Sequence, residues 1–317
     1  MNETSDSFNI SPEEAGLRLD RVLAARYKEF RSRTYFQSLI DEGQVLLNGA
    51  PVKKRIAPKA GDLIEIAFPL SKEITLEAEP IPLDILYEDD DLLIINKPPG
   101  LVVHPAPGNW TGTLVNGLLY HCKTISAPSV FSEEAPPRPG IVHRLDKDTS
   151  GAILMGKNDA ITAKLSTLFS ERDVYKEYLA VCIGNPGNRK IDLPIARHSV
   201  NRKQMAIHED GRPSITHCRS IAHDEKFSLV QLVLETGRTH QIRVHLKAVN
   251  CPILGDATYG NAQVNEKLAA ARPLLHSRVL RFKHPIKGVE IEAIAPLPED
   301  IQFFMRKFHC DTVPKFV

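Results

Sequence analysis

The chain has 317 residues, and its 42% hydrophobic and 25% charged content is typical of globular proteins with room for two domains. It contains no apolar run near the ~20 residues that a membrane span needs, and its first residues are too polar for a secretory signal. Five scattered cysteines without a C-x-x-C pair argue against a disulfide framework and a structural zinc site. We therefore expect a cytoplasmic protein that makes no contact with a membrane.

The net charge of +1 conceals three blocks of opposite sign. Residues 17–61 contain ten Lys and Arg against four Asp and Glu, whereas residues 62–100 contain two against ten. Residues 189–247 are basic again, with eleven against six. Two basic blocks favour an anionic partner that touches two surfaces, most simply a nucleic acid, although ordinary solvated faces also carry such charges.

The N-terminal part of the chain has the pattern of a small helical domain followed by short strands. Apolar residues at helical spacing predict helices over residues 17–26 and 32–42, the second with Ser32 as its N-cap. Asn48-Gly49 between apolar residues is a strong hairpin signal. We expect three segments along the chain: a flexible tail (1–16), a small basic domain with its linker (17–80) and a large domain (81–317).

The small domain resembles the S4 RNA-binding domain over about residues 17–66. The resemblance rests on four motifs: RLDxxL from residue 18, SRxxxxxLIxxGxV from residue 32, NG at residue 48 and GDxI from residue 61. A helix pair with cations on one face also suits recognition of phosphates and folded RNA, although an oligomerisation module is the alternative. The resemblance implies that seven residues face RNA: Arg18, Arg21, Ser32, Arg33, Gln37, Asn48 and Lys53.

The large domain contains many predicted strands and few crossover helices. Strands are predicted at 85–87, 92–97, 175–181 and 227–235, and helices at 113–120 and 159–171. This order predicts an α+β fold on a mixed, mainly antiparallel sheet with flanking helices. The acidic turn at residues 88–91 is interpreted as a solvated hairpin tip, with a metal site as the less favoured reading. Residues 123–139 are rich in Ser and Pro and are expected to form a mobile loop.

One loop, HRLDKDTSG at residues 143–151, gathers unusually many polar groups before an apolar run. Matches to a calcium loop, a phosphate loop and a zinc-protease motif each fail, because ligand positions are apolar, absent or wrongly spaced. Asp146 lies between Arg144 and Lys147, and this positive charge favours the ionised carboxylate that a nucleophile needs. Asp148 is either a second acid, as in glycosidases, or a residue that holds the turn. Read alone, the loop suits a capped turn as well as a catalytic site.

The signature HRLDxxTSG resembles that of the RluA family of pseudouridine synthases. Further blocks match this family in order: KPPG from residue 97, HP at 104, YKEY from 175, GRTHQIRVH from 237, GDxxYG from 255 and LH at 275. The resemblance covers about residues 81–298. It implies that the enzyme isomerises uridine to pseudouridine in RNA with one carboxylate in a dry pocket, without a cofactor or a metal.

The resemblance also implies roles for single residues. Asp146 is the catalytic carboxylate, by attack on the sugar or by abstraction of a sugar proton, and Tyr178 stacks on the base. Arg243 pairs with Asp146, and Arg144 fills the space that the flipped nucleotide leaves. Four more residues are expected to contact the substrate or to support these groups: His104, Arg238, His240 and His245.

The S4-like segment in front and the sequence Asp146-Lys147-Asp148 are most similar to RluD-type members, which modify the helix 69 stem-loop of 23S ribosomal RNA. RluC-type members have a similar architecture and are the alternative. Ribosomal RNA, and not DNA, is the expected partner of a monomeric protein. Two other classes remain open: an RNA-binding protein that has lost activity, and a glycoside hydrolase.

Overall fold

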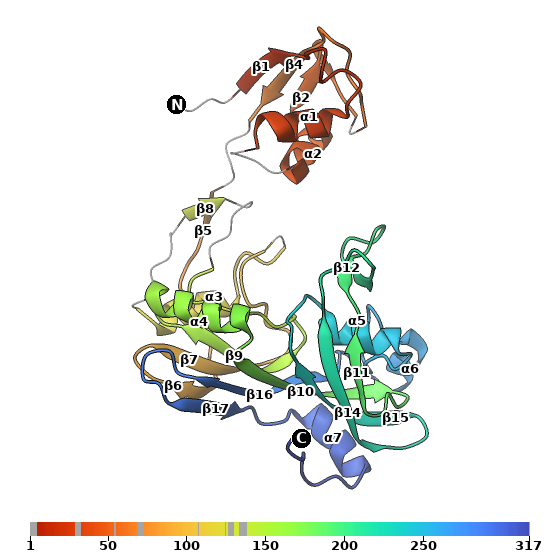
Figure 1. Cartoon of the computed structure of the whole chain (residues 1–317). Coiled ribbons are helices and arrows are strands. Elements are labelled where there is room, and N and C mark those ends of the chain that lie inside the picture. The colour runs from red at the N-terminus through yellow and green to blue at the C-terminus, as the bar shows by residue number, and fades with distance from the viewer. Residues whose placement is uncertain are drawn as a thin grey trace. The chain divides into compact units, whose positions relative to one another are not determined.

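The computed structural model describes residues 5–28, 33–53, 55–68, 73–106, 108–123, 125, 130–132 and 138–316. The chain divides into two compact units, shown in Figure 1. The N-terminal unit comprises Met1–Ile74 with Val130–Pro136, and the C-terminal unit comprises Thr75–Ser129 with Pro137–Val317. Each unit has its own hydrophobic core.

The N-terminal unit packs two helices against a four-stranded sheet of order β1-β4-β2-β3. Its elements are β1 (Ser5–Asn9), α1 (Leu19–Arg26), α2 (Arg33–Asp41), β2 (Val45–Leu47), β3 (Ala50–Pro51) and β4 (Leu63–Ala67). Leu19 and Leu23 of α1 and Phe36 of α2 are completely buried in one cluster with Ile64 of β4. The predicted helix pair and hairpin are confirmed, and positive φ at Asn48 and Gly49 produces the tight turn.

The prediction of a flexible tail over residues 1–16 is wrong for the part that the structure describes. Residues 5–9 form β1, which pairs antiparallel with β4, and Ile10 beside it is 2% exposed. The sequence of β1 is mostly polar because only an occasional residue of this edge strand turns inward. Its order comes from hydrogen bonds to a strand nearly 60 residues away, as the pairing Ser5↔Ala67 shows. The N-terminal unit also ends at Ile74, before the expected boundary at residue 80.

The C-terminal unit is built on a nine-stranded sheet of order β11-β14-β15-β10-β16-β9-β7-β6, with β17 paired to β16. The pair β9–β16 is parallel and the other pairs are antiparallel, so the predicted mixed sheet is confirmed. The strands are β6 (Ile85–Glu88), β7 (Leu92–Lys97), β9 (Ser150–Gly156), β10 (Val174–Ile183), β11 (Arg189–Asp192), β14 (Ile215–His223), β15 (Phe227–Leu234), β16 (Leu275–Lys283) and β17 (Glu290–Ile294). Two small ribbons add β5 (Glu73–Thr75) with β8 (Val130–Ser132), and β12 (Ile195–Arg197) with β13 (Met205–Ile207).

Helices cover both faces of this sheet. Alternation along β7 sends Leu93 and Ile95 into the cluster with α3, and Leu92 and Ile94 into the cluster with α4. The helices are α3 (Leu114–His121), α4 (Asp159–Glu171), α5 (Gln241–Ala248), α6 (Ala262–Lys267) and α7 (Glu299–Lys307). Among the described residues, no helix is long and apolar enough to cross a membrane.

Candidate active site

The polar loop at residues 143–149 leads directly into β9, and the buried side chain of Lys97 is hydrogen-bonded to this loop. Lys97 ends β7 and is completely buried, yet its Nζ donates hydrogen bonds to the carbonyls of Pro98, Leu101 and Lys147 at 2.8, 3.0 and 2.9 Å. Burial lowers the pKa of Lys97 to about 8, while Asp148 and Asp146 act in the opposite direction. Lys97 therefore ties the end of β7 to the loop that carries Asp146.

Close packing of main chains also sets the loop. Gly151 has φ +107°, and a Cβ there would lie 2.1 Å from the carbonyl oxygen of Ser277 on β16. Only glycine tolerates both this positive φ and this close contact, so Gly151 allows the start of β9 to pair with β16. The side chain of Asp148 is exposed and makes no hydrogen bond with described residues, contrary to the role in the turn that we expected. Its carbonyl instead accepts from Arg272 at 3.3 Å.

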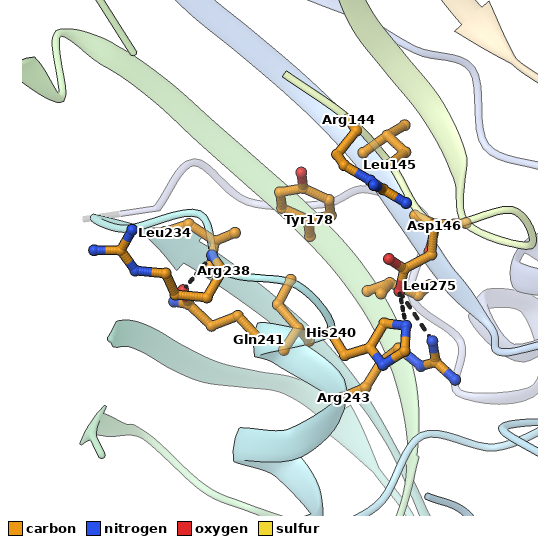
Figure 2. Close-up of a pocket in the computed structure, with 12 residues that line it drawn as sticks. Arg144, Leu145, Asp146, Tyr178, Leu234, Arg238, His240, Gln241, Arg243 and Leu275 are labelled. Carbon is orange, nitrogen blue, oxygen red and sulfur yellow. Dashed lines mark hydrogen bonds and ion pairs between the residues drawn. The ribbon is translucent and has the colours of Figure 1, made fainter. Parts of the chain in front are cut away.

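Asp146 is paired with Arg243 of α5, as the sequence predicts. Arg243 Nη1 donates to Asp146 Oδ2 at 3.0 Å, and Figure 2 shows the two side chains meeting at the edge of a pocket. The other side of the guanidinium donates to both carboxylate oxygens of Asp256, at 2.7 and 2.9 Å. Arg243 is 8% exposed and Asp256 is 1% exposed. The guanidinium is thereby held in one plane between two carboxylates.

Electrostatics favours the charged forms of this buried pair. Burial alone would lower the pKa of Arg243, but the hydrogen bonds and charge of Asp256 outweigh burial and raise it. Burial likewise opposes ionisation of Asp256, whereas Arg243 lowers its pKa below the ordinary value. Asp256 also accepts from the backbone N–H groups of Thr258 and Tyr259. Asp256 belongs to the GDxxYG block, but the block alone did not predict its contact with Arg243.

Tyr259 and His240 form a hydrogen-bonded pair beside Asp146. The hydroxyl of Tyr259 accepts from the backbone N–H of Met205 at 2.7 Å and lies 2.8 Å from His240 Nδ1. The hydroxyl thus lies within hydrogen-bond distance of both the Met205 N–H and the His240 ring. Nε2 lies 3.9 Å from Asp146 Oδ2. Burial lowers the pKa of His240, so the ring stays neutral near pH 7.

Asp146 faces a cleft made of two cavities that share five lining residues. The larger has a volume of about 480 Å³, within the range of small-molecule sites. Tyr178 of β10 is 6% exposed there, and burial raises the pKa of its hydroxyl to about 12, so the phenol is protonated at neutral pH. The shared residues, several of them visible in Figure 2, are Arg144, Asp146, Tyr178, Leu234 and Arg238.

Two predicted histidines lie elsewhere. His104 is 6% exposed and lines neither cavity, although Arg144 is near enough for its charge, after burial, to lower the pKa of His104. His245 is completely buried, with Nδ1 2.9 Å from Thr216 Oγ1 and Nε2 3.0 Å from the carbonyl of Leu193. His245 thus joins α5 to the sheet and is not a substrate contact.

Three of the residues predicted to face RNA share one partner in the N-terminal unit. Arg18, Arg33 and Gln37 all donate to the buried carboxylate of Asp20, at distances between 2.6 and 3.0 Å. The side chains of Arg18 and Arg33 remain 39% and 40% exposed, so Asp20 orients two guanidinium groups at the surface.

The other four positions differ more. Asn48 bonds to the side chain of Asp62 and to the N–H of Leu63, which assigns it to the hairpin and not to a ligand. Arg21 and Lys53 are exposed, and Ser32 lies outside the described residues.

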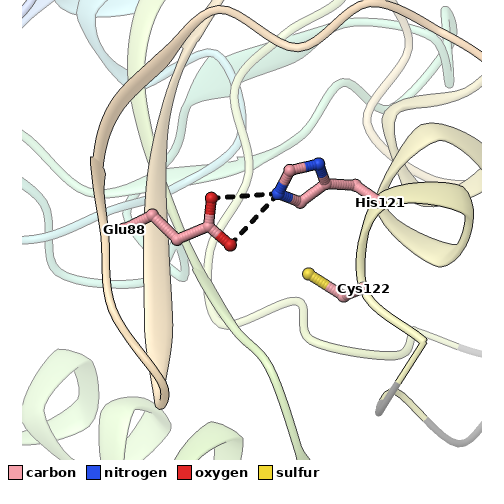
Figure 3. Close-up of side chains that lie close together, drawn as sticks. All are labelled: Glu88, His121 and Cys122. Atoms are coloured by element: carbon pink, nitrogen blue, oxygen red, sulfur yellow. Dashed lines mark hydrogen bonds and ion pairs between the residues drawn. The ribbon is translucent and has the colours of Figure 1, made fainter.

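Among the described residues, two clusters of side chains that could bind a metal ion lie outside the cleft. Figure 3 shows Glu88 facing His121 Nε2 with both oxygens, at 3.1 and 2.9 Å, with Cys122 beside them. Lys157 Nζ binds the same carboxylate at 2.9 Å, so this lysine already supplies a cation at Glu88.

The second cluster joins Asp89 and Asp91 of the acidic turn to His284. His284 Nδ1 accepts from the N–H groups of Ile286 and Lys287, which places its proton on Nε2, 3.1 Å from Asp89 Oδ2. A protonated Nε2 has no lone pair for a metal. His284 and Lys287 both contact Asp89, at 3.1 and 2.7 Å, so the turn is more structured than the solvated tip that we predicted.

Comparison with known proteins agrees with this geometry. A family model described as RNA pseudouridylate synthase matches residues 91–248, and an S4 domain model matches residues 17–64. The uncharacterized RNA pseudouridine synthase YlyB of Bacillus subtilis is 42% identical, with 93% of this chain and 95% of that protein covered. Ribosomal large subunit pseudouridine synthase D of Vibrio vulnificus is 40% identical, with coverage of 92% and 91%.

A solved structure shares the fold. Human RNA pseudouridylate synthase domain containing 1 superposes with a TM-score of 0.55 at 26% identity, and the match covers 75% of this chain and 99% of that one. The chain therefore belongs to the RNA pseudouridine synthase family, with an S4 domain ahead of the synthase domain.

Proposed function

We propose that the protein isomerises uridines of the helix 69 stem-loop of 23S ribosomal RNA to pseudouridine, with Asp146 as the catalytic carboxylate. The observation that carries the proposal is Asp146 itself, held by the buried Arg243–Asp256 pair at the edge of an arginine-lined cleft. The choice of large-subunit RNA is supported by relatives about 40% identical that are named ribosomal large subunit pseudouridine synthase D.

The reaction needs little besides position and a dry site. Uridine and pseudouridine are isomers. The bond from N1 to C1′ breaks, the uracil turns, and C5 bonds to C1′. C5 then loses its proton and N1 gains one, so the composition does not change. Arg243 occupies Oδ2 of Asp146, and no described residue donates a hydrogen bond to Oδ1. In our proposal Oδ1 faces the ribose of the target nucleotide, where a fixed carboxylate acts at high effective concentration.

Tyr178 and Arg144 complete the proposed site. The protonated phenol of Tyr178 contacts the flipped uracil and keeps water away from it. Arg144 is exposed at the rim and has no carboxylate partner among the described residues, so its guanidinium is available to take the place of the flipped base. We propose further that the protein acts as a monomer on ribosomal RNA in the cytoplasm.

Pseudouridine mapping tests the proposal. Ribosomal RNA from a strain lacking the gene is compared by chemical mapping with RNA from strains rescued by wild type or by Asp146→Asn. We expect helix 69 pseudouridines to return with wild type alone. Sites that return elsewhere in 23S RNA indicate an RluC-type target, and release of free uracil indicates a hydrolase. Rescue by Asp146→Asn contradicts the role of Asp146.

A further inference from the structure

The cleft contains more positive charge than the proposed chemistry uses. Its lining includes the cations Arg144, Arg172, Lys176 and Arg238. Its carboxylates are already engaged, since Asp146 is bound by Arg243 and Glu235 lies 2.6 Å from His217 Nε2. Two of these cations lie close together along the chain: Arg172 follows α4 directly and Lys176 lies on β10.

Lys176 is the most unusual of these cations because it is buried without an acid. It is 6% exposed, and its Nζ donates one hydrogen bond, to the carbonyl of Val174 at 3.0 Å. The adjacent Glu177 is bound instead by Arg278 and by the Tyr175 hydroxyl, both at 2.9 Å. Within the described part of the chain, no carboxylate pairs with Lys176. Burial lowers the pKa of Lys176, and the nearby charge of Arg172 lowers it further.

Arg172 approaches the same place from the end of α4. It is exposed and adopts a left-handed conformation with φ 69°, which glycine usually provides after a helix. No ion pair or hydrogen bond engages its guanidinium among the residues that the structure describes. Two cations thus stand together at the cleft, and each lacks the anion that normally accompanies a buried or clustered positive charge.

We infer that Lys176 and Arg172 form a binding site for one phosphodiester group of the RNA, on a nucleotide next to the target uridine. The inference rests on the proposed function, because it uses the same cleft and substrate. Nζ keeps two N–H donors after its bond to Val174, and a guanidinium presents a fork that matches two phosphate oxygens. A phosphate would supply the missing anion and fix the strand so that its neighbour reaches Asp146.

Neutral linkages in synthetic RNA test this site. Helix 69 stem-loops that each carry one methylphosphonate near the target uridine are titrated with wild type, Lys176→Met, Arg172→Gln and the control Lys164→Gln. Lys164 is an exposed residue of α4 that does not line the cleft. We expect Lys176→Met and Arg172→Gln to weaken binding about tenfold and to reduce the salt slope by about 0.7, and Lys164→Gln to do neither.

The decisive result is non-additivity at one linkage. A single methylphosphonate should weaken binding by wild type but have no further effect on Lys176→Met. Lys176→Met should melt no earlier than wild type, because it removes a buried charge that has no carboxylate partner among the described residues, whereas loss of a purely structural residue would lower the melting temperature. Additive losses at every linkage, or Lys176→Met binding as tightly as Lys164→Gln, would overturn the inference.

Two further arms separate the alternatives. Competition by inorganic phosphate that depends on Lys176, without any linkage effect, would assign the site to a free anion and overturn the inference. Pseudouridine formation is followed in the same samples, and binding is repeated on a full 23S transcript. Wild type that shows the linkage effect but forms no pseudouridine would refute the proposed function and leave the phosphate site intact.

Discussion

Asp146 owes its geometry to one guanidinium that contacts two carboxylates. Arg243 reaches Asp146 with Nη1 and Asp256 with Nε and Nη2, so the plane of its guanidinium is fixed by the buried Asp256 and not by Asp146. Asp256 is 1% exposed and anchored by two backbone N–H groups. Asp256 therefore holds the guanidinium that binds Asp146, although Asp256 lines neither cavity of the cleft.

Arg243→Lys tests this arrangement at the level of one residue. A single ammonium has no planar fork and cannot serve both carboxylates, so we expect kcat to fall about 100-fold while KM changes little. Steady-state kinetics on a synthetic stem-loop checks the expectation. A variant with unchanged kcat would show that the bridge between the two carboxylates does not matter.

Part of the site was predictable from residue types and part was not. The pairing of Arg243 with Asp146 followed from the resemblance to the family, and the structure places Arg243 Nη1 3.0 Å from Asp146 Oδ2. Lys97 was missed because its partners are main-chain carbonyls, one of them 50 residues away, which residue types do not reveal. His104 was expected near the substrate, yet it lies buried outside both cavities.

At the scale of elements, Asp20 joins the two helices of the S4 domain. Its carboxylate is completely buried on α1 and accepts hydrogen bonds from Arg33 and Gln37 of α2 and from Arg18. Burial raises the pKa of Asp20, but these hydrogen bonds outweigh burial and lower it from 3.8 to about 2. The folded state thus holds this proton less tightly than the unfolded state.

The sign of the pH effect follows from that difference. The contribution of Asp20 to stability is present above pH 4 and is lost as pH falls toward 2, by about 2 kcal/mol in total. Urea unfolding of wild type and Asp20→Asn, followed by amide NMR signals of α1, should show their difference shrinking by this amount between pH 5 and pH 2. Glu42→Gln, an exposed carboxylate in the same unit, is the control. A difference that does not change with pH would contradict the account.

Elements with local signals were predicted well. Helix α4 begins where Asn158 caps the N–H of Ile161 and ends at the left-handed Arg172, and its bounds match the prediction. Strand β1 carried no such signal because its residues are polar and its order depends on β4. The ribbon of β12 and β13, three residues in each strand, was likewise too short to be recognised by periodicity.

At the scale of the whole molecule, the two basic blocks of the sequence lie in different units. One belongs to the S4 domain and the other supplies cleft residues such as Arg238 and Arg243. The order of predicted strands and helices indicated the α+β fold class, which the structure confirms. The strand order could not be predicted from the sequence, because neighbouring strands can be far apart along the chain. In the parallel pair β9–β16, Ser150 lies beside His276, 126 residues later.

Removal of residues 1–72 tests the division of labour between the units. We expect RNA affinity to fall by about tenfold or more and the salt slope to decrease, while kcat at saturating RNA stays close to that of the full chain. The full-length variant Arg21→Gln/Lys53→Gln, which changes two exposed cations, should show a smaller loss of the same kind. Unchanged affinity and salt slope in the truncated protein would show that the S4 domain does not bind this RNA.

The central claim is that Asp146 performs the chemistry and is not needed for RNA binding. Purified wild type and Asp146→Asn are incubated with 23S ribosomal RNA, and pseudouridine formation and RNA affinity are measured in parallel. We expect stoichiometric pseudouridine in helix 69 with wild type, none with Asp146→Asn, and affinities within about threefold of each other. Measurable pseudouridine formation by Asp146→Asn would contradict the account.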